Sequence, residues 1–207
     1  MKTDKKIMKL YAVTDRGWLK PGEDLSGPVE ELLKAGVTCV QLREKNAADD
    51  LFVREAVTLK ALCSRYDVPL IINDRPDIAL KAGADGVHVG LSDLSIEKAR
   101  QMLGEDSIIG GSAHNVAEAL AAQAAGADYI GCGAVFGSTT KQDVTMLSLE
   151  ELKAICGAVD IPVVAIGGIH TGNFHLLSGT GISGIAVISA LFGAEDKAEA
   201  VKTLLQL

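Results

Sequence analysis

The sequence has few of the features that mark metal-binding, redox or membrane proteins. Its 207 residues include only four cysteines: Cys39, Cys63, Cys132 and Cys156. They form no CxxC pair, and no histidine stands beside them at the spacing of a zinc site, so buried free thiols are favoured over disulfides or a metal centre. No apolar run approaches the ~18 residues of a membrane-spanning helix, and the apolar segment after the first lysines breaks at Thr14, too early for a secretory signal. We therefore expect a cytoplasmic protein with no membrane contact.

Positive charge is also scarce. Twenty lysines and arginines stand against 27 aspartates and glutamates, which gives a net charge of −7. A nucleic-acid surface needs a basic patch that neutralises phosphates. The composition therefore argues against nucleic acid as a partner, and any anionic ligand must be bound by a few local cations.

What the sequence does contain is a regular alternation of apolar segments with segments of helical period. Most of the apolar segments are apolar on both faces, as strands of a buried parallel sheet are. The predicted strands are residues 8–14, 39–43, 70–73, 86–90, 107–111, 129–135, 162–167 and 184–189. The predicted helices are residues 28–35, 49–66, 76–82, 95–103, 116–125, 148–156, 171–178 and 190–205. Eight of each predict an α/β protein, a single (β/α)8 TIM barrel over residues 1–207, a fold that starts at about 200 residues.

Similar phrases precede alternate strands of this barrel. They read AGVTCV, AGADGV, AGADYI and TGISGI. A glycine that ends a helix, followed by a short loop into the next strand, explains them. An ancient internal repeat is the alternative.

Polar residues cluster where the predicted strands end, which is the active-site face of a barrel. Gln41, Arg43 and Lys45 alternate along the second strand, so they point into the barrel mouth while Leu42 points toward the helices. Two cations and an amide on one face suit a polyanion. The alternative is an internal ion pair with barrel carboxylates.

Carboxylates follow the third and fourth strands. Asn73 and Asp74 end one, and Asp93 lies just past the other. Because neighbouring parallel strands lie about 4.8 Å apart, both carboxylates can reach one ion, and Mg²⁺ is usually held by two carboxylates together with water and phosphate. The alternative is helix capping, ahead of Pro76 and Ser95.

Two more segments favour anion binding. The loop after the sixth strand carries hydroxyls at Ser138, Thr139 and Thr140 and a cation at Lys141. These residues suit a gate that closes over a bound anion. The alternative is a solvent-exposed turn, which would have a similar sequence. Gly167–Gly168 and Ile188–Ser189 end the last two strands, where barrels commonly bind phosphate through backbone N–H groups. A tight turn and a helix N-cap are the alternatives there.

In order and spacing these motifs resemble the thiamine phosphate synthase (thiamine-phosphate diphosphorylase) family over nearly the whole chain. The matching segments are residues 10–15, 41–45, 73–75, 83–88, 112–114, 138–141, 167–168 and 188–189. The resemblance implies a transferase that moves a 4-amino-2-methylpyrimidin-5-ylmethyl group from its diphosphate onto the ring nitrogen of a thiazole phosphate. The expected products are thiamine phosphate and diphosphate.

The resemblance also implies roles for individual residues. The expected contacts of the pyrimidine diphosphate are Gln41, Leu42, Arg43, Glu44, Lys45, Asn73, Ser112 and Lys141, of which Arg43, Lys45, Ser112 and Lys141 are the expected catalytic residues. The expected Mg²⁺ ligands are Asp74 and Asp93. The expected contacts of the thiazole phosphate are Ser138, Thr139, Thr140, Gly168, Ile188 and Ser189. Two positions depart from the family: Leu91 stands where glutamine is usual, and Ser138 where threonine is common.

The implied mechanism needs no protein nucleophile. Diphosphate is a good leaving group once a metal ion and cations stabilise its charge, and the thiazole nitrogen captures the resulting pyrimidine carbocation if it is held at near-attack distance. Two alternatives are a thiazole tautomerase-like enzyme and a non-catalytic regulatory barrel that binds thiazole phosphate. A homo-oligomer is compatible with the sequence.

Overall fold

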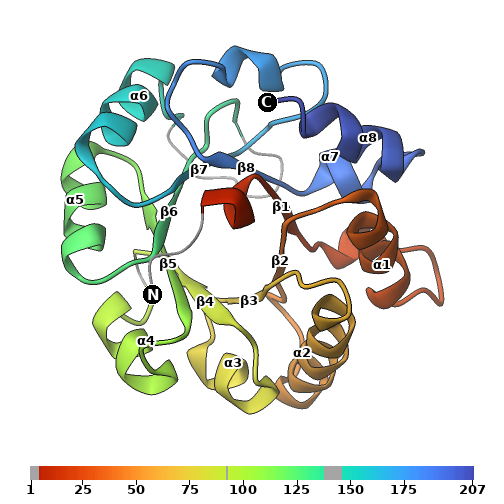
Figure 1. Ribbon diagram of the computed structural model, residues 1–207. Helices are drawn as coiled ribbons and strands as arrows, with labels where there is room; N and C mark the ends of the chain where they lie inside the picture. Colours follow the sequence, from red (N-terminus) through yellow and green to blue (C-terminus); the bar gives the residue numbers. More distant parts are fainter. Residues whose placement is uncertain (1–4, 92, 138–145) are drawn as a thin grey trace.

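Eight parallel strands close into a barrel in chain order, and helices surround it (Figure 1). The computed structural model describes residues 5–91, 93–137 and 146–207. The strands are β1 Leu10–Val13, β2 Cys39–Leu42, β3 Leu70–Asn73, β4 Gly86–Val89, β5 Ile108–Ala113, β6 Tyr129–Cys132, β7 Val163–Ile166 and β8 Gly184–Val187. The α-helices are α1 Ser26–Ala35, α2 Asp49–Ser64, α3 Pro76–Ala82, α4 Ile96–Leu103, α5 Val116–Ala124, α6 Leu149–Ala158, α7 Ser189–Phe192 and α8 Lys197–Leu204, and the 3-10 helices are η1 Lys5–Met8, η2 Arg16–Trp18 and η3 Phe174–Leu177. The predicted TIM barrel is confirmed.

Three predicted elements differ from the structure by more than their bounds or start well away from the expected residue. The predicted strand 8–14 starts later, because residues 5–8 form η1, which lies over the amino-terminal end of the barrel (Figure 1). The predicted helix 171–178 is only the short η3. The predicted helix 190–205 is two helices, since α7 ends at Gly193 and α8 restarts where the Asp196 carboxylate accepts the Glu199 N–H. Periodicity alone does not locate such a break, since an N-cap is a local hydrogen bond.

The alternation of side chains along the strands builds two apolar layers. A small cluster fills the inside of the barrel: Met8, Tyr11, Val13, Cys39, Ile71, Tyr129, Val164 and Ala186. A larger cluster, which includes Leu10, Ala12 and Val40, lies between the strands and the helices. All four thiols are free, and burial raises the pKa of Cys63 and of Cys132 to about 12. Within the described ranges, no helix combines the length and the apolar character that crossing a membrane requires.

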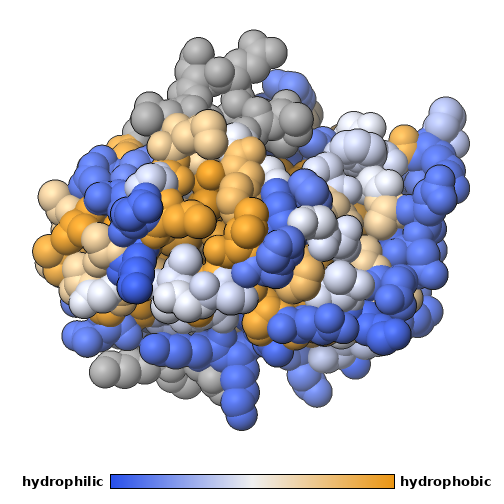
Figure 2. All heavy atoms as spheres, turned by 90° about the horizontal axis from the view of Figure 1, so that it is seen from above, coloured by the Kyte–Doolittle hydropathy of each residue, from blue (hydrophilic) through white to orange (hydrophobic). Residues whose placement is uncertain are grey.

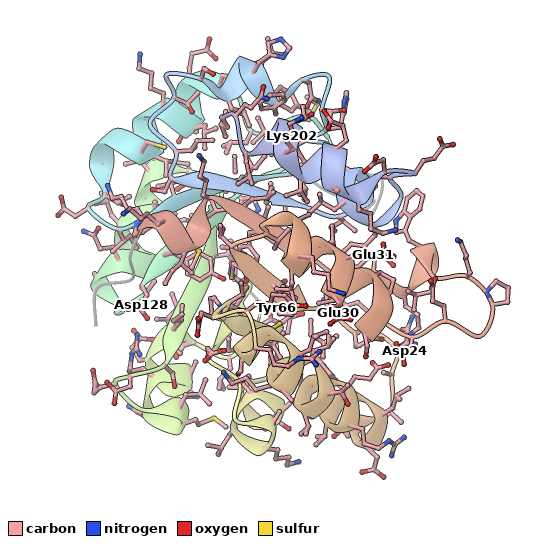
Figure 3. All side chains as sticks on the ribbon, turned by 45° about the vertical axis from the view of Figure 1, so that its right-hand side comes forward. Asp24, Glu30, Glu31, Tyr66, Asp128 and Lys202 are labelled. Atoms are coloured by element: carbon pink, nitrogen blue, oxygen red, sulfur yellow. The ribbon has the colours of Figure 1, made fainter. Side chains whose placement is uncertain are left out.

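The recurring phrases AGADGV and AGADYI have a structural role at the amino-terminal end of the barrel. Asp85 Oδ2 accepts the N–H of Leu70, and Asp128 Oδ2 accepts the N–H of Ile109, so each aspartate is hydrogen-bonded to the start of the preceding strand. Arg100 pairs with Asp128 at 2.6 Å, and Asp128 is labelled in Figure 3. We call these two hydrogen-bonded aspartates the lower clasps. They join neighbouring strands at the end opposite to the predicted site, where barrels place stabilising residues.

The outer surface of the barrel is mixed in character. Figure 2 shows an area in which hydrophobic residues gather beside charged ones. Large exposed hydrophobic side chains include Met146, which precedes α6, and Leu176 in η3. A homo-oligomer stays a prediction from the sequence.

Gly110 in β5 makes room for a buried tyrosine. A Cβ atom at this position would lie 2.2 Å from Cζ of Tyr129. We therefore expect Gly110→Ala to lower the free energy of unfolding by about 1–3 kcal/mol through overpacking. Gly157→Ala is the matched control, because a Cβ there meets no atom within 4 Å and the residue is helical, so it should stabilise by about 0.5–1 kcal/mol. Urea denaturation measures both; equal effects would contradict the packing assigned to Gly110.

Candidate active site

A cavity of about 420 Å³ opens at the carboxyl ends of the strands. Every predicted ligand residue that the structure describes lines it, except Leu42 and Glu44. The predicted residues on its wall are Gln41, Arg43, Lys45, Asn73, Asp74, Asp93, Ser112, Gly168, Ile188 and Ser189. Ser138, Thr139, Thr140 and Lys141 lie outside the described residues.

Leu42 and Glu44 face away from the cavity. Leu42 is buried in the layer between strands and helices, as its alternation with Gln41 predicts. The Glu44 carboxylate pairs with Arg16 at 3.2 Å, and burial raises its pKa. Neither side chain is placed to contact a ligand in the cavity, so we leave both out of the proposed site.

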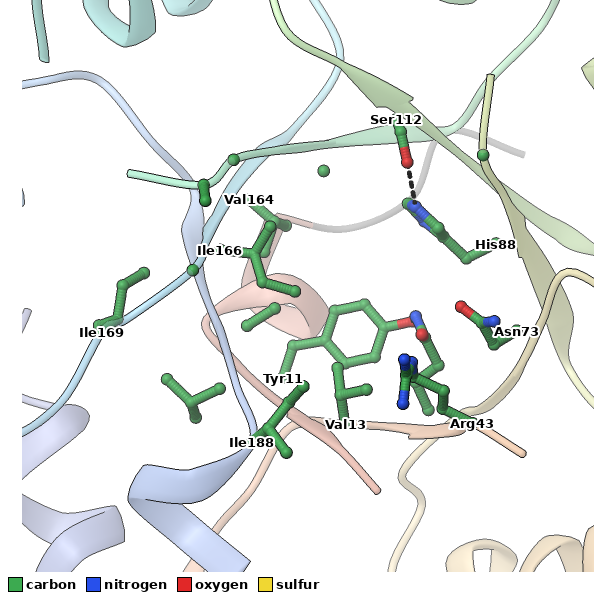
Figure 4. Close-up of a pocket in the computed structure, with 18 of the residues that line it drawn as sticks. Tyr11, Val13, Arg43, Asn73, His88, Ser112, Val164, Ile166, Ile169 and Ile188 are labelled. Carbon is green, nitrogen blue, oxygen red and sulfur yellow. Dashed lines mark hydrogen bonds between the residues drawn. The ribbon is translucent and has the colours of Figure 1, made fainter. Parts of the chain in front are cut away.

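The cavity has a polar side and an apolar side. Figure 4 shows Arg43, Asn73, His88 and Ser112 on one side. They come from β2, β3, β4 and β5 or from the loops that follow them. Val164, Ile166, Ile169 and Ile188, from the β7 and β8 region, form the other side. A ligand with an ionic end and an aromatic end matches this division.

Asp74 and Asp93 are neighbours on the polar side. Both line the cavity, and burial together with the nearby Asp74 raises the pKa of Asp93. Burial opposes ionisation of Asp74 too, but a hydrogen bond from Lys45 Nζ at 2.6 Å helps to lower its pKa. Asn73 Nδ2 donates to the same carboxylate oxygen at 2.6 Å. The ion pair that was the alternative role for Lys45 is therefore present, and its partner is a predicted metal ligand.

Helix capping does not account for these two aspartates. The residue that precedes α3 is Arg75, and its side chain makes no cap hydrogen bond. The N-cap of α4 is Ser95, whose hydroxyl accepts the Lys98 N–H. Asp93 instead accepts the N–H of Gly90 at 2.8 Å. The capping alternative is wrong at both positions.

The carboxylate pair fits Mg²⁺ by its donor chemistry. Burial and the neighbouring Asp74 disfavour ionisation of Asp93, so a cation beside the two carboxyl groups would stabilise their charged forms. The parts of the chain that the structure describes hold no group of three or more acidic, histidine or cysteine side chains arranged for a metal. Two hard oxygen ligands are enough for Mg²⁺, which keeps several waters and takes its other ligands from substrate phosphates.

Arg43 offers a cation to the cavity. Its backbone N–H donates to Thr14 Oγ1 at 3.0 Å, which fixes the chain at the end of β2. Among the described residues its guanidinium makes no ion pair. It is therefore available to a carboxylate or phosphate, for which its planar fork is suited.

Glycines form the wall at the end of β7. Gly167 and Gly168 have φ of 105° and 64°, and a Cβ at Gly168 would lie 2.4 Å from the Phe136 carbonyl oxygen. The side chain of Asn173 donates to the Gly168 carbonyl at 2.9 Å. A larger residue at 168 would strain this turn itself, so it cannot probe ligand binding selectively. The N-cap of α7 is Ile188 rather than Ser189, so the capping alternative for Ser189 is wrong.

The floor of the cavity contains three residues that we did not predict as site residues. Tyr11, His88 and Tyr129 line it beside Gln41 and Ser112. The signal that could have found them is the two-residue alternation: Tyr11 and Tyr129 share the inward face of their strands with Val13 and Gly131, and His88 shares that of β4 with Gly86. Leu91, at the position where glutamine is usual in the family, also lines the cavity and is 60% exposed.

Comparison with known proteins identifies the family. The family model described as "Thiamine monophosphate synthase" matches residues 10–191. The chain is 52% identical to the thiamine-phosphate synthase of Clostridium acetobutylicum over 193 residues, which are 92% of this chain and 91% of the relative. The chain belongs to the thiamine-phosphate synthase family. The enzyme of that name from Methanobrevibacter smithii is 49% identical over 96% of this chain and 94% of its own.

Solved structures agree with this assignment. The thiamine phosphate pyrophosphorylase of Pyrococcus furiosus superposes with a TM-score of 0.88 at 40% identity, and the match covers 98% of this chain and 96% of that one. A 3-hexulose-6-phosphate synthase, at 21% identity and a TM-score of 0.67, shares the fold alone. The thiamine-phosphate synthase relatives support the transferase reading, and neither the tautomerase-like nor the non-catalytic alternative finds support.

Proposed function

We propose that this protein joins 4-amino-2-methyl-5-(diphosphooxymethyl)pyrimidine to a thiazole phosphate and releases thiamine phosphate and diphosphate. The observation that carries the proposal is one cavity that brings together a carboxylate pair, a glycine turn and an arginine that makes no ion pair with any residue the structure describes. Two anionic substrates need two anion sites, and the ends of β2–β4 and of β7–β8 supply them on opposite sides. Family membership supplies the identity of the substrates.

The polar side binds the pyrimidine diphosphate in this proposal. Arg43 and Lys45, with Lys141 from outside the described residues, donate to the diphosphate oxygens, and Asn73 donates its amide. These donors stabilise the charge that grows on the diphosphate as its bond to the pyrimidine methylene breaks. Ser112 contacts the same substrate from β5.

Asp74 and Asp93, both on the cavity wall, would hold Mg²⁺. When bound, the ion supplies Lewis-acid stabilisation of the leaving diphosphate. The Lys45 ammonium, which pairs with Asp74 at 2.6 Å, is then placed beside both the metal ligand and the substrate. Its role is to orient the carboxylate and to donate to the diphosphate.

The apolar side and the glycine turn bind the thiazole phosphate. Gly168, Ile188 and Ser189, with Ser138, Thr139 and Thr140, would hold the phosphate, while Ile166 and Ile169 pack against the ring. This placement directs the thiazole nitrogen toward the pyrimidine methylene, so that capture of the carbocation is faster than its hydrolysis. Exclusion of water by residues 138–141 would serve the same end.

One assay tests the proposal. The purified protein is incubated with the pyrimidine diphosphate, the thiazole phosphate and Mg²⁺, and thiamine phosphate and diphosphate are measured together. Equal amounts of the two products, both dependent on the thiazole phosphate, are expected. Diphosphate without thiamine phosphate would show a hydrolase, and no product from either substrate would refute the proposal.

The two anion sites are separable by mutation. Ser189→Ala should raise KM for the thiazole phosphate by about 3- to 10-fold, since it removes one hydrogen bond to a charged group, and should change KM for the pyrimidine diphosphate by less than about twofold. Ser178→Ala, an exposed serine that does not line the cavity, is the control. Both KM values are measured by steady-state kinetics with each substrate varied in turn. Equal changes in the two KM values would mean that Ser189 does not belong to the thiazole phosphate site.

We also propose that the protein works in the cytoplasm. All four cysteines are free thiols, three of them buried, which suits a reducing compartment. Localisation of a tagged chain in fractionated cells tests this.

A further inference from the structure

A row of hydrogen bonds crosses the cavity floor from β2 to β5. Gln41 Nε2 donates to Tyr11 Oη at 2.8 Å, and Tyr11 Oη lies 2.9 Å from Tyr129 Oη. Tyr129 Oη lies 3.0 Å from His88 Nδ1, and His88 Nε2 lies 3.1 Å from Ser112 Oγ. Figure 4 shows the last of these bonds, between His88 and Ser112. We call these five residues the floor array. Tyr129 stands in the middle of the floor array, where its hydroxyl connects the Gln41–Tyr11 pair to the His88–Ser112 pair. It is only 1% exposed.

Proton counting gives the floor array a direction. Each tyrosine has one proton to donate, and burial raises the pKa of both tyrosines well above its usual value, so both stay protonated. Tyr11 accepts from Gln41, so its own proton points to Tyr129. Tyr129 must then donate to His88 Nδ1, which leaves the ring proton on Nε2, where it points to Ser112.

With the Gln41 amide oriented as the structure has it, the opposite direction leaves a buried donor without an acceptor. If Ser112 donated to His88, and His88 to Tyr129, then Tyr11 would accept from both Tyr129 and Gln41. Its own proton would have no acceptor among the residues that the structure describes. An unsatisfied donor at this depth costs about 1–3 kcal/mol, and within the floor array only a turned-over Gln41 amide would remove it. The first direction is therefore the one that fits the structure, in which Gln41 Nε2 donates to Tyr11 Oη at 2.8 Å.

From this we infer that Tyr129 is a positioning residue, which sets the direction of the floor array and thereby presents an acceptor, Gln41 Oε1, and a donor, the Ser112 hydroxyl, to the pyrimidine substrate. Gln41 and Ser112 both line the cavity. In the first direction, no other described residue accepts from the Ser112 hydroxyl or donates to Gln41 Oε1. A matching ligand carries an amino group that donates to Gln41 Oε1 and an acceptor atom that receives the Ser112 hydroxyl proton. The 4-aminopyrimidine diphosphate has both, so the inference rests on the proposed function for the identity of the ligand.

Removing the Tyr129 hydroxyl should reverse one end of the floor array. In Tyr129→Phe the Tyr11 proton loses its acceptor, and the nearest alternative is Gln41 Oε1 after the amide turns over. Gln41 then presents an NH₂ donor to the cavity where the substrate also carries a donor. His88 Nδ1 loses its hydrogen bond at the same time, while the apolar contacts of the ring stay.

The test combines imidazole ¹⁵N NMR of the ligand-free protein with steady-state kinetics. Signals of His88, one of four histidines, are assigned by their loss in His88→Asn and read at a pH at which the ring is neutral. We expect the Nε2–H tautomer in the wild type and, in Tyr129→Phe, a Nδ1 signal displaced toward that of an unbonded ring nitrogen. We expect KM for the pyrimidine diphosphate to rise about tenfold, as loss of roughly one buried hydrogen bond implies, with KM for the thiazole phosphate changed less than about twofold.

Tyr66→Phe is the matched control. The Tyr66 hydroxyl donates to Glu30 at 3.1 Å outside the cavity, where Figure 3 labels both residues. It should leave the His88 signals and both KM values unchanged. A wild-type Nδ1–H tautomer, His88 signals unmoved in Tyr129→Phe, or equal changes in the two KM values would each overturn the inference.

Two further results keep the tests independent. If Tyr129→Phe fails to fold, the wild-type tautomer still decides the direction, and Tyr11→Phe repeats the kinetic test from the neighbouring hydroxyl. If the wild type forms no thiamine phosphate, the proposed function fails while the NMR result still supports or overturns the direction of the floor array.

Discussion

Asp74→Asn should lower kcat/KM by about 10²–10³-fold while changing the free energy of unfolding by less than about 1 kcal/mol. The activity falls because an amide oxygen is neutral and the carboxylate pair loses the charge that attracts Mg²⁺. The fold survives because Asp74 has φ of 62°, a left-handed conformation that asparagine tolerates well. Activity is measured over a range of Mg²⁺ concentrations and unfolding by urea. Asp93→Asn should give a similar loss.

Asp77→Asn is the control for this prediction. Asp77 lies in α3, three residues away, and pairs with Arg75 at 2.7 Å on the outside of the barrel. Its replacement should leave activity unchanged. Calorimetric titration with Mg²⁺ should show weaker binding in Asp74→Asn than in Asp77→Asn. Full activity of the wild type in EDTA would refute the metal assignment.

Arg43→Ala should cost about 2–4 kcal/mol in kcat/KM for the pyrimidine diphosphate. The guanidinium has no other ion-pair partner within the described ranges, so its removal affects the ligand rather than an internal salt bridge. Arg43→Lys should restore little, because an ammonium group lacks the two-pronged geometry of the guanidinium.

The matched control is Arg65→Ala. Arg65 pairs with Glu30 at 3.3 Å and is largely exposed, and exposed pairs contribute about 0–1 kcal/mol to stability. Near-native kcat/KM in Arg43→Ala would move the diphosphate contact to Lys45 or Lys141. A loss of the same size in Arg65→Ala would mean that the effect is not specific to the cavity.

The strands could be predicted well because burial on both faces leaves a clear pattern. Seven of the eight predicted strands contain the observed one, and the exception is β5, which continues through Ser112 and Ala113. Those residues are polar or small, so the apolar run gives no sign that the strand continues. Helices were predicted less accurately where a local hydrogen bond decides the boundary, as at Asp196.

The cavity wall could be predicted from the carboxyl ends of the strands, but its floor could not be assigned in the same way. Charged residues at a strand end stand out in a sequence, whereas Tyr11 and Tyr129 lie in the middle of apolar strands and read as core. The role proposed for them depends on the closed barrel, which brings Tyr11 Oη of β1 within 2.9 Å of Tyr129 Oη of β6. Lys45 shows the other limit, since only the folded chain shows that its partner is Asp74.

The lower clasps have a consequence for how this barrel could be re-engineered. Asp85 and Asp128 join strands at one end, and a strand of four residues is about 13 Å long, so the determinants of closure lie a full strand length from the cavity. The loops that follow the carboxyl ends of the strands could therefore be exchanged or randomised without weakening the hydrogen bonds by which Asp85 and Asp128 join neighbouring strands. We expect libraries that vary these loops to retain soluble, cooperatively melting members far more often than libraries that vary positions 85 and 128.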